Sequence, residues 1–136
     1  MVKLFFDVNV ILDVPLQRIS PQIESQKVLT LAESGVVAGF TSAVACATIH
    51  YLVARAIGSR QALLFIKDLL RVVTVVEVNR SILNRALELD GLDFEDNIQI
   101  ACAEKVSADH IITRNPKDYR HSAISVLSPA QYLSMQ

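Results

Sequence analysis

Residues 1–13 read MVKLFFDVNVILD, and this stretch decides the fold class. Residues 2–6 (VKLFF) form an apolar run of strand length that stops at Asp7, and Asn9 and Asp13 follow closely. A continuously apolar strand is typical of a parallel sheet that helices cover on both faces. Open parallel sheets bind their ligands at the carboxyl ends of the strands. The opening stretch therefore predicts a buried first strand that carries a carboxylate to this edge.

The rest of the chain alternates between helix-like and strand-like segments. We expect helices at 20–35, 43–57, 59–71, 79–91, 93–108 and 128–135, and strands at 36–42, 72–78, 109–115 and 124–127. Ser20 and Ser59 are the expected N-caps of the first and third of these helices. This order predicts an α/β fold, namely a three-layer α/β/α sandwich with a central parallel sheet, in one domain over residues 1–136.

The composition excludes several classes of protein. A formal net charge of -1 over 136 residues is not that of a generally basic nucleic-acid binder, so any such contact needs a local basic patch. The two cysteines, Cys46 and Cys102, have no close CxxC partner and are expected to be small buried residues in a reducing compartment. No apolar run is long enough to span a membrane, and no signal-peptide pattern opens the chain. We therefore expect a cytoplasmic protein without a membrane partner.

Acidic and amide side chains gather at one predicted edge of the sheet. Asp7 ends the first strand, and Asn115 follows the strand HIIT, with Asp118 three residues later. Asp93 and Asp96 lie where the preceding helix begins. If the first strand and HIIT are neighbours, these oxygen atoms converge. Three or four oxygen ligands in one place suit Mg²⁺ or Mn²⁺, which can activate water for attack on a phosphodiester.

Each of these residues also has a purely structural interpretation. Asp7 can cap a helix that starts near Asn9. Asp93 can cap the helix that follows it, with Asp96 in the first turn, where the helix dipole favours acidic side chains. The stretch NPKD at 115–118 is an ordinary turn sequence. Only the order and placement of these residues together point to a metal site.

Basic and aromatic residues near the same edge are candidates for contact with a nucleic acid. Arg114 and Lys117 flank Asn115, and Arg18 can join the same rim. Such cations can hold a phosphate backbone, although charged residues are equally common on exposed turns. Tyr119 is a candidate for base stacking or for filling the core.

Three stretches resemble the PIN domain, the nuclease fold of VapC-type toxins. They are FFDVNVILD (5–13), DFEDNIQIACA (93–103) and HIITRNPKDY (110–119), and the resemblance runs nearly from end to end. It implies a small α/β/α protein with a parallel sheet that acts as a Mg²⁺- or Mn²⁺-dependent endoribonuclease on RNA. It also implies an antitoxin protein as partner and a homodimer. The high hydrophobic content, 51% against 20% charged residues, fits an apolar surface that a partner covers.

The resemblance assigns roles residue by residue. Asp7 and Asp96 match the family acids that bind metal. Asn115 falls where the family usually has its last Asp, and the nearby Asp118 can substitute for it. The expected catalytic residues are therefore Asp7, Asp96, Asn115 and Asp118, of which the first three bind the metal, and the expected supporting residues are Asn9, Asp93 and Thr113.

One position departs from the family pattern. The family's second acid is usually a Glu on the helix after the second strand, and here Thr48 takes its place. Fewer carboxylates bind a divalent cation more weakly, and Glu95 and Asp93 are the acids that can partly compensate. The second hypothesis is therefore a degenerate PIN domain that binds RNA or a protein without cutting.

A third hypothesis is a phosphatase or receiver-like domain that uses Asp7 as nucleophile or phosphoacceptor. Such phosphatases need an acid at the position of Asn9. Receivers need an acidic pair before the first-strand Asp, where this chain has Phe5 and Phe6. These differences disfavour the third hypothesis.

Overall fold

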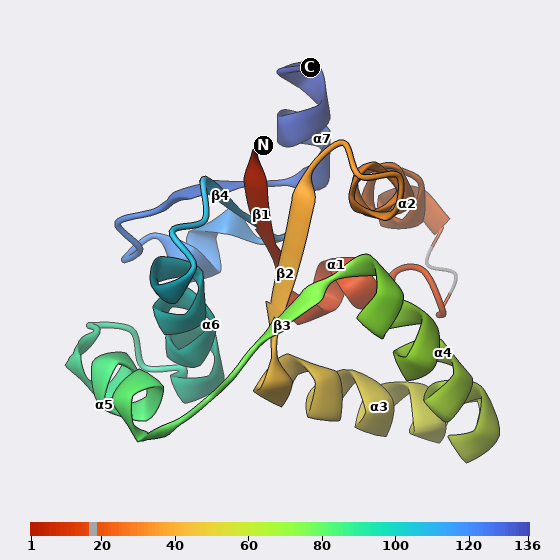
Figure 1. Cartoon of the computed structure of the whole chain (residues 1–136), viewed down its shortest axis with the longest axis horizontal. Coiled ribbons are helices and arrows are strands. Elements are labelled where there is room, and N and C mark those ends of the chain that lie inside the picture. The colour runs from red at the N-terminus through yellow and green to blue at the C-terminus, as the bar shows by residue number, and fades with distance from the viewer. Residues whose placement is uncertain (17–18) are drawn as a thin grey trace.

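A parallel sheet forms the centre of the molecule, as the sequence predicts (Figure 1). The computed structural model describes residues 1–16 and 19–136, and the side chains of these residues except 19–22. In this part of the chain five strands pair in the order β3-β2-β1-β4-β5. The strands are β1 (Lys3–Phe6), β2 (Ala38–Ser42), β3 (Thr74–Val76), β4 (His110–Ile112) and β5 (Ser125–Leu127).

Helices cover both faces of this sheet, which confirms the three-layer α/β/α architecture. They are α1 (Val8–Leu12), α2 (Ile19–Glu33), α3 (Ala43–Ile57), α4 (Ser59–Val72), α5 (Arg80–Glu88), α6 (Phe94–Lys105) and α7 (Pro129–Ser134), with a short 3-10 helix, η1 (Pro116–Tyr119). Helices α5 and α6 lie on one face, and α1–α4 and α7 pack on the other (Figure 1). Among the described residues, no helix combines the length and the apolar character that crossing a membrane requires.

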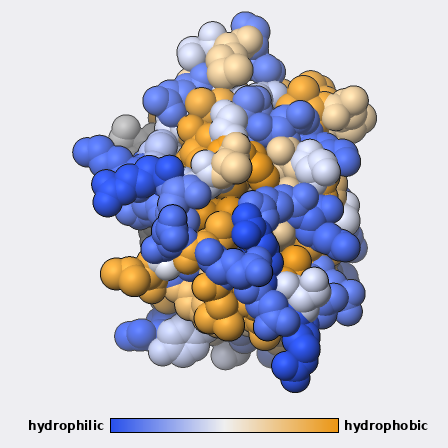
Figure 2. Space-filling model, turned by 90° about the vertical axis from the view of Figure 1, so that its left-hand side faces the viewer, coloured by the Kyte–Doolittle hydropathy of each residue, from blue (hydrophilic) through white to orange (hydrophobic). Residues whose placement is uncertain are grey.

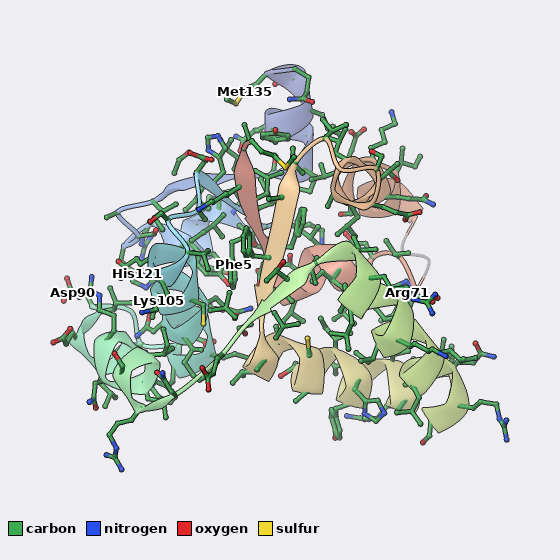
Figure 3. The ribbon with its side chains drawn as sticks, viewed as in Figure 1. Phe5, Arg71, Asp90, Lys105, His121 and Met135 are labelled. Atoms are coloured by element: carbon green, nitrogen blue, oxygen red, sulfur yellow. The ribbon has the colours of Figure 1, made fainter. Side chains whose placement is uncertain are left out.

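The side chains of β1 alternate between two cores. Leu4 and Phe6 pack against α1–α4 and α7, whereas Phe5 packs against α5 and α6 (Figure 3). All three are fully buried, and burying such a side chain contributes about 1.5–3 kcal/mol. The apolar run therefore reflects a strand that is covered on both faces. Cys102 is buried in the second core, and Cys46 is half-buried beside the first.

Two helix starts differ from the caps that the sequence predicted. Helix α2 begins at Ile19, so the expected N-cap Ser20 lies inside the helix. Helix α4 begins at Ser59 itself, and its N-cap is Gly58, which also ends α3. Gly58 has a φ of 99°, a conformation that glycine adopts at little cost. One glycine thus turns the chain directly from α3 into α4, which leaves no separate position for a serine cap.

Several predicted elements also differ in extent. The strands expected at 72–78 and 109–115 shorten to the three residues each of β3 and β4. The segment NPKD, interpreted as a turn, forms most of η1. The short helix expected near Asn9 is α1, which starts directly after Asp7.

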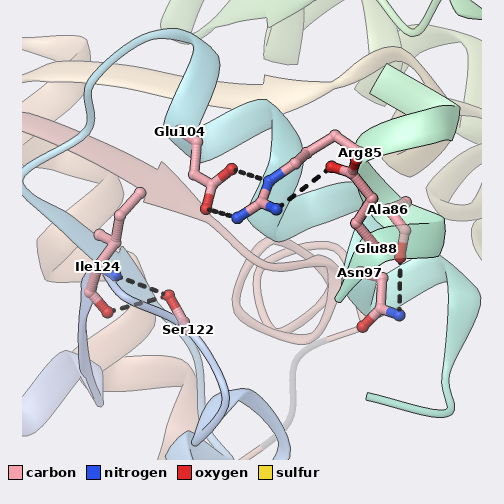
Figure 4. Close-up of polar contacts among 7 residues, drawn as sticks. All are labelled: Arg85, Ala86, Glu88, Asn97, Glu104, Ser122 and Ile124. Atoms are coloured by element: carbon pink, nitrogen blue, oxygen red, sulfur yellow. Dashed lines mark hydrogen bonds and ion pairs between the residues drawn. The ribbon is translucent and has the colours of Figure 1, made fainter. Parts of the chain in front are cut away.

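Polar contacts fix α5 against α6, and so hold the helix that carries Asp96 (Figure 4). The Arg85 guanidinium donates to both carboxylate oxygens of Glu104, at 2.8 and 3.0 Å. Asn97 Nδ2 donates to the Ala86 carbonyl at 3.2 Å, so the start of α6 is tied to the end of α5.

Candidate active site

Strands β1 and β4 are parallel neighbours, which is the condition on which the predicted site depended. Phe6 is in register with Ile112, so Asp7 and Thr113 are the next residues on the two strands. The Asp7 N–H donates to the Ile112 carbonyl at 2.9 Å. The Thr113 hydroxyl donates to Asp7 Oδ2 at 2.8 Å. The end of the first strand and the end of HIIT therefore meet at one edge of the sheet.

Asp7 is buried, with 8% of its surface exposed, and it also has a structural role. It is the N-cap of α1, because its Oδ1 accepts from the Val8 N–H at 2.7 Å. Burial raises the pKa of the Asp7 carboxyl, and hydrogen bonds from Thr113, Tyr119 and Val8 oppose this rise. The capping interpretation is thus correct, and it leaves a buried carboxylate at the edge of the sheet.

Thr113 is the centre of the hydrogen bonds that support Asp7. Besides donating to Asp7, its hydroxyl oxygen accepts from Asn9 Nδ2 at 3.4 Å and from the Asn115 N–H at 3.2 Å. Asn9 Oδ1 in turn accepts from the Arg114 N–H at 3.2 Å. Asn9 and Thr113 therefore join the segment after β4 to the start of α1.

Asp96 reaches the same edge from the first turn of α6. Asp93 caps this helix by accepting from the Asp96 N–H at 3.0 Å. The Asp96 carboxyl is half-buried and accepts from the Tyr119 hydroxyl at 3.3 Å. Burial and, to a smaller extent, the charges of Asp93 and Asp7 together raise the pKa of Asp96 to about 7. The carboxyl groups of Asp7 and Asp96 therefore repel each other across this edge.

The contact of Tyr119 with the acids of this site is the feature that the sequence did not predict. Its side chain is 1% exposed, so it is a core residue and not a surface for stacking bases. Burial and the carboxylates of Asp7 and Asp96 raise the pKa of its hydroxyl, which keeps its proton and hydrogen-bonds toward both acids. Tyr119 and Asp96 are 23 residues apart in the sequence, so no local sequence pattern predicts their contact.

The remaining predicted acids and amides lie at the rim of the site. Asp118, in η1, is exposed, and its charge raises the pKa of both Asp7 and Asp96. The Asn115 side chain is also exposed, and its backbone N–H binds the Thr113 hydroxyl. Asp7, Asp96, Asn115 and Asp118 are therefore brought to one edge.

The donor set suits a hard divalent cation. It consists of oxygen atoms, and the charges of Asp93, Asp7 and Asp118 each raise the pKa of Asp96. Among the described residues, no three His, Cys, Asp or Glu side chains are arranged to share one ion. Magnesium is commonly held by one or two carboxylates together with waters and substrate phosphates. Asp7 and Asp96 fit a site of this open type and not an enclosed protein cage.

The predicted basic residues differ in their surroundings. Arg114 Nε lies 3.2 Å from Oδ2 of the fully buried Asp13, whose same oxygen accepts from the Ser25 hydroxyl. The Arg114 side chain is 28% exposed, so only part of it faces solvent. Lys117 is exposed. Arg18 lies outside the described residues.

A cavity adjoins Asp96 on the side of α5 and α6. It has a volume of about 610 Å³, and its lining includes Asp96, Lys117, Asp118, Arg120 and His121. His121 lies beside α6 near Asp90, which also lines the cavity (Figure 3). Figure 2 views this side of the molecule, where hydrophilic side chains alternate with apolar patches. Lys117 and Arg120 thus place cations next to the acidic edge.

Comparisons with solved structures show which proteins share this fold. A chain of the VapBC2 complex from Rickettsia felis, solved with promoter DNA, is 13% identical and matches with a TM-score of 0.74, covering 93% of this chain and 98% of that one. A chain of a toxin–antitoxin complex from Klebsiella pneumoniae is 19% identical and matches with a TM-score of 0.69. The match covers 92% of this chain and 96% of that one. VapC20 of Mycobacterium tuberculosis, described as a sarcin-ricin loop cleaving toxin, is 19% identical and matches with a TM-score of 0.65. The match covers 79% of this chain and 86% of that one.

Sequence comparison identifies the family. No curated protein matches the chain. The sequence model described as PIN domain, however, matches residues 3–117, which include the whole sheet except β5 and every acid of the site except Asp118. Since this match extends over most of the chain, and the fold is that of VapC structures, the chain belongs to the PIN domain family.

Proposed function

We propose that this protein is a metal-dependent endoribonuclease, the toxin component of a toxin–antitoxin pair, with Mg²⁺ or Mn²⁺ as cofactor. The observation that carries the proposal is the convergence of Asp7 and Asp96 at one edge of the sheet, where burial, together with the charges of Asp93 and Asp7, raises the pKa of Asp96 to about 7. Perturbed carboxylates of this kind are typical of functional sites. Membership of the PIN domain family supports the assignment, as does the likeness in fold to VapC20, a sarcin-ricin loop cleaving toxin.

Each residue of the site has a defined role in this proposal. Asp7 and Asp96 bind the cation, with Asn115 and Asp118 beside them. When bound, the cation supplies an activated water and offsets the charge of the phosphodiester. Thr113 and the Val8 N–H hold Asp7 in orientation, and Tyr119 holds Asp96.

Cations on the neighbouring segment complete the substrate site. Lys117 and the exposed part of Arg114 contact the RNA backbone on either side of the reacting phosphate. Arg18, which lies outside the described residues, is included as a third such cation from its sequence position alone. Because the net charge of the chain is -1, this local arrangement has to supply the attraction for RNA.

The partners follow from the family and from the surface. The Klebsiella structure is a toxin–antitoxin complex and the Rickettsia structure is a VapBC2 complex, and we infer an antitoxin protein for this chain as well. Exposed apolar side chains on α3 and α4 suit burial against that protein or a second copy in a homodimer; they are Tyr51, Ile57, Leu63, Leu64 and Leu70. We place the protein in the cytoplasm as one domain over residues 1–136.

Cleavage of a mixed RNA pool tests this function. We expect cutting with Mn²⁺, no cutting with EDTA, and none by Asp7→Asn in the presence of Mn²⁺. Asp68→Asn, an exposed acid on α4 away from the site, is the matched control and should cut like the wild type. Full cleavage by folded Asp7→Asn, or cleavage that EDTA does not affect, would contradict the proposal.

A specific observation keeps a second function in view. Thr48 stands where the family usually has a Glu, and the described residues contain no three-ligand metal group. Both features favour a PIN domain that binds RNA or a protein without cutting. This second function predicts RNA binding by fluorescence anisotropy that EDTA leaves unchanged, together with intact RNA after incubation with any metal.

A further inference from the structure

Asp13 is a fully buried acid that the candidate active site does not use. It is the C-cap of α1, and the N-cap of the same helix is Asp7. Because a helix rises about 1.5 Å per residue, the backbones of the two acids are about 9 Å apart along α1. One short helix therefore has a buried acid at each end, and a buried charge is retained only where other groups pair with it.

Two segments from elsewhere in the chain contact Asp13. The Ser25 hydroxyl, from α2, donates to Asp13 Oδ2 at 2.7 Å, and Ser25 is itself fully buried. Arg114 Nε, from the segment after β4, lies 3.2 Å from the same carboxylate oxygen. Helix α2 thus fixes the carboxyl group of Asp13, and Asp13 in turn fixes an arginine.

The Arg114 guanidinium is held on its inner edge and open on its outer edge. Its Nε is buried, and its contact with Asp13 is an ion pair without a directed hydrogen bond. Neither Nη atom donates a hydrogen bond to a described residue, and neither is buried. These outer N–H groups form the planar fork that matches a phosphate. They are therefore available to a ligand in solvent.

The backbone of Arg114 is fixed beside the acids of the candidate active site. Its N–H donates to Asn9 Oδ1 at 3.2 Å. It directly follows Thr113, whose hydroxyl donates to Asp7. Asn9 lies in the first turn of α1, and Asp13 ends this helix. Helix α1 therefore holds the main chain and the side chain of Arg114 at two different points, which gives the guanidinium a defined position relative to Asp7.

We propose that Asp13 is a positioning residue for RNA, which orients the Arg114 guanidinium as a two-point donor to a phosphate that flanks the reacting one. This inference rests on the RNA-cleaving site of the proposed function. An unpaired arginine side chain has many rotamers, and ordering them on binding costs free energy. The ion pair with Asp13 orders the side chain before RNA arrives. Asp13 touches no substrate and acts through Arg114 alone.

The sign of the effect on RNA binding separates this role from simple neutralisation of Arg114. Asp13→Asn removes one negative charge, so the formal net charge of the chain changes from -1 to 0. This change by itself strengthens the attraction for RNA. A carboxylate that orients Arg114 predicts the opposite, namely weaker RNA binding although a repulsive charge is gone. The direction of the change is therefore the test.

Binding of a fluorescein-labelled single-stranded RNA to the full chain, measured by fluorescence anisotropy in EDTA, is the experiment. We expect Asp13→Asn to raise the Kd about threefold, and Ser25→Ala, which changes no charge, to raise it about twofold. Asp68→Asn is the matched control, because Asp68 also pairs with an arginine, Arg71 at 3.9 Å, but at an exposed position of α4. Its Kd should stay equal or fall by less than about twofold.

A double-mutant cycle shows whether Asp13 acts through Arg114. Arg114→Gln should raise the Kd about tenfold and reduce the slope of log Kd against log salt by about 0.7, as expected for one phosphate contact of a single strand. Asp13→Asn/Arg114→Gln should bind RNA as Arg114→Gln does, because the carboxylate then has no arginine to orient. A merely structural role of Asp13 predicts that the two losses add.

Thermal unfolding shows which variants are folded. If Asp13→Asn is not folded, Ser25→Ala and Ser25→Ala/Arg114→Gln complete the same cycle, since Ser25 fixes the carboxyl group of Asp13 without carrying charge. In that cycle too, the effect of Ser25→Ala should disappear when Arg114 is absent.

Two sets of outcomes overturn the inference, and they can be told apart. If Asp13→Asn binds RNA as tightly as the wild type or more tightly, or if the losses in the cycle add in full, Asp13 does not orient Arg114. The proposed nuclease then still stands, provided that the wild type cuts RNA with Mn²⁺. If the wild type neither binds nor cuts RNA, the inference fails together with the proposed function.

Discussion

The charged side chains at the two ends of α6 have opposite surroundings. At its C-terminal end Glu104 meets Arg85 in a paired, two-point contact at the surface. At its N-terminal end Asp96 is half-buried and faces the like charges of Asp93, Asp7 and Asp118. The charges at the first end are paired, whereas the carboxylates at the second end repel one another, and a proton or a bound cation would reduce this repulsion.

The difference shows where the fold serves stability and where it serves function. Exposed ion pairs contribute little to the free energy of unfolding. Buried like charges lower it, and proteins retain them where activity requires them. Removing the charge of Asp96 should therefore stabilise the protein and inactivate it, while changes at the C-terminal end of α6 should do little.

The largest expected effect is that of Asp96→Asn on catalysis. We expect RNA cleavage to fall at least about 100-fold, because a cation ligand is lost while the shape of the side chain is kept. The measurement is the initial rate of RNA cleavage with Mn²⁺, and Glu104→Gln is the control. Near wild-type cleavage by Asp96→Asn would mean that the repulsion at this end of α6 has no catalytic purpose.

The second effect is on stability and depends on pH. The pKa of Asp96 is about 7 in the folded protein against an ordinary value of 3.8, so the unfolded chain loses this proton first. Stability is thus lost as pH rises from about 4 to 7, and without divalent cation Asp96→Asn should be about 1–2 kcal/mol more stable at pH 8, allowing for partial exposure.

Urea unfolding of Asp96→Asn and wild type in EDTA at several pH values measures this difference. The gap should be small near pH 4 and should widen through pH 7. Added Mg²⁺ should narrow it by stabilising the wild type alone. A gap that does not change with pH would show that the charge of Asp96 is not the cause.

Tyr119→Phe sharpens the comparison, because it removes the hydroxyl that offsets part of the repulsion. The pKa of Asp96 should rise further, since Tyr119 lowers it by its hydrogen bond. We expect the midpoint of the pH–rate profile of cleavage to move upward by less than about one unit. Tyr132→Phe, a second buried tyrosine that packs in the other core, is the control. An unchanged midpoint in Tyr119→Phe would show that the Tyr119 hydroxyl does not influence the pKa of Asp96.

The smallest effect is expected at the opposite end of α6. Arg85→Ala breaks the paired contact with Glu104 at an exposed position. We expect the melting temperature to stay within about 2 °C of the wild type and RNA cleavage to be unchanged. Calorimetric melting curves measure the first quantity and the cleavage assay the second. A large loss of cleavage would show that the contact between Arg85 and Glu104 also determines the position of Asp96.

Local rules were enough to predict much of this protein from its sequence. The apolar run VKLFF marked a strand buried on both faces, since no solvent-facing polar side chain interrupts it after Lys3. The acids at the end of that strand and at the start of α6 were readable because a strand end and a helix N-terminus are defined by their immediate neighbours. The helix caps predicted at Ser20 and Ser59 were wrong, because α2 begins one residue earlier, at Ile19, and α4 begins at Ser59 itself with Gly58 as its N-cap.

The tertiary structure alone decided how these residues meet. The order of strands placed β4 beside β1 and so joined Asp7 to Thr113, which are 106 residues apart. The packing of α6 against α3 and η1 directed Glu95 to Thr48 and Asp96 to Tyr119. Sequence patterns report which face of an element is apolar, and they carry no information on which distant element covers that face. The sequence by itself therefore determined the fold class and the supply of carboxylates, and only the tertiary structure decided which of them share a site.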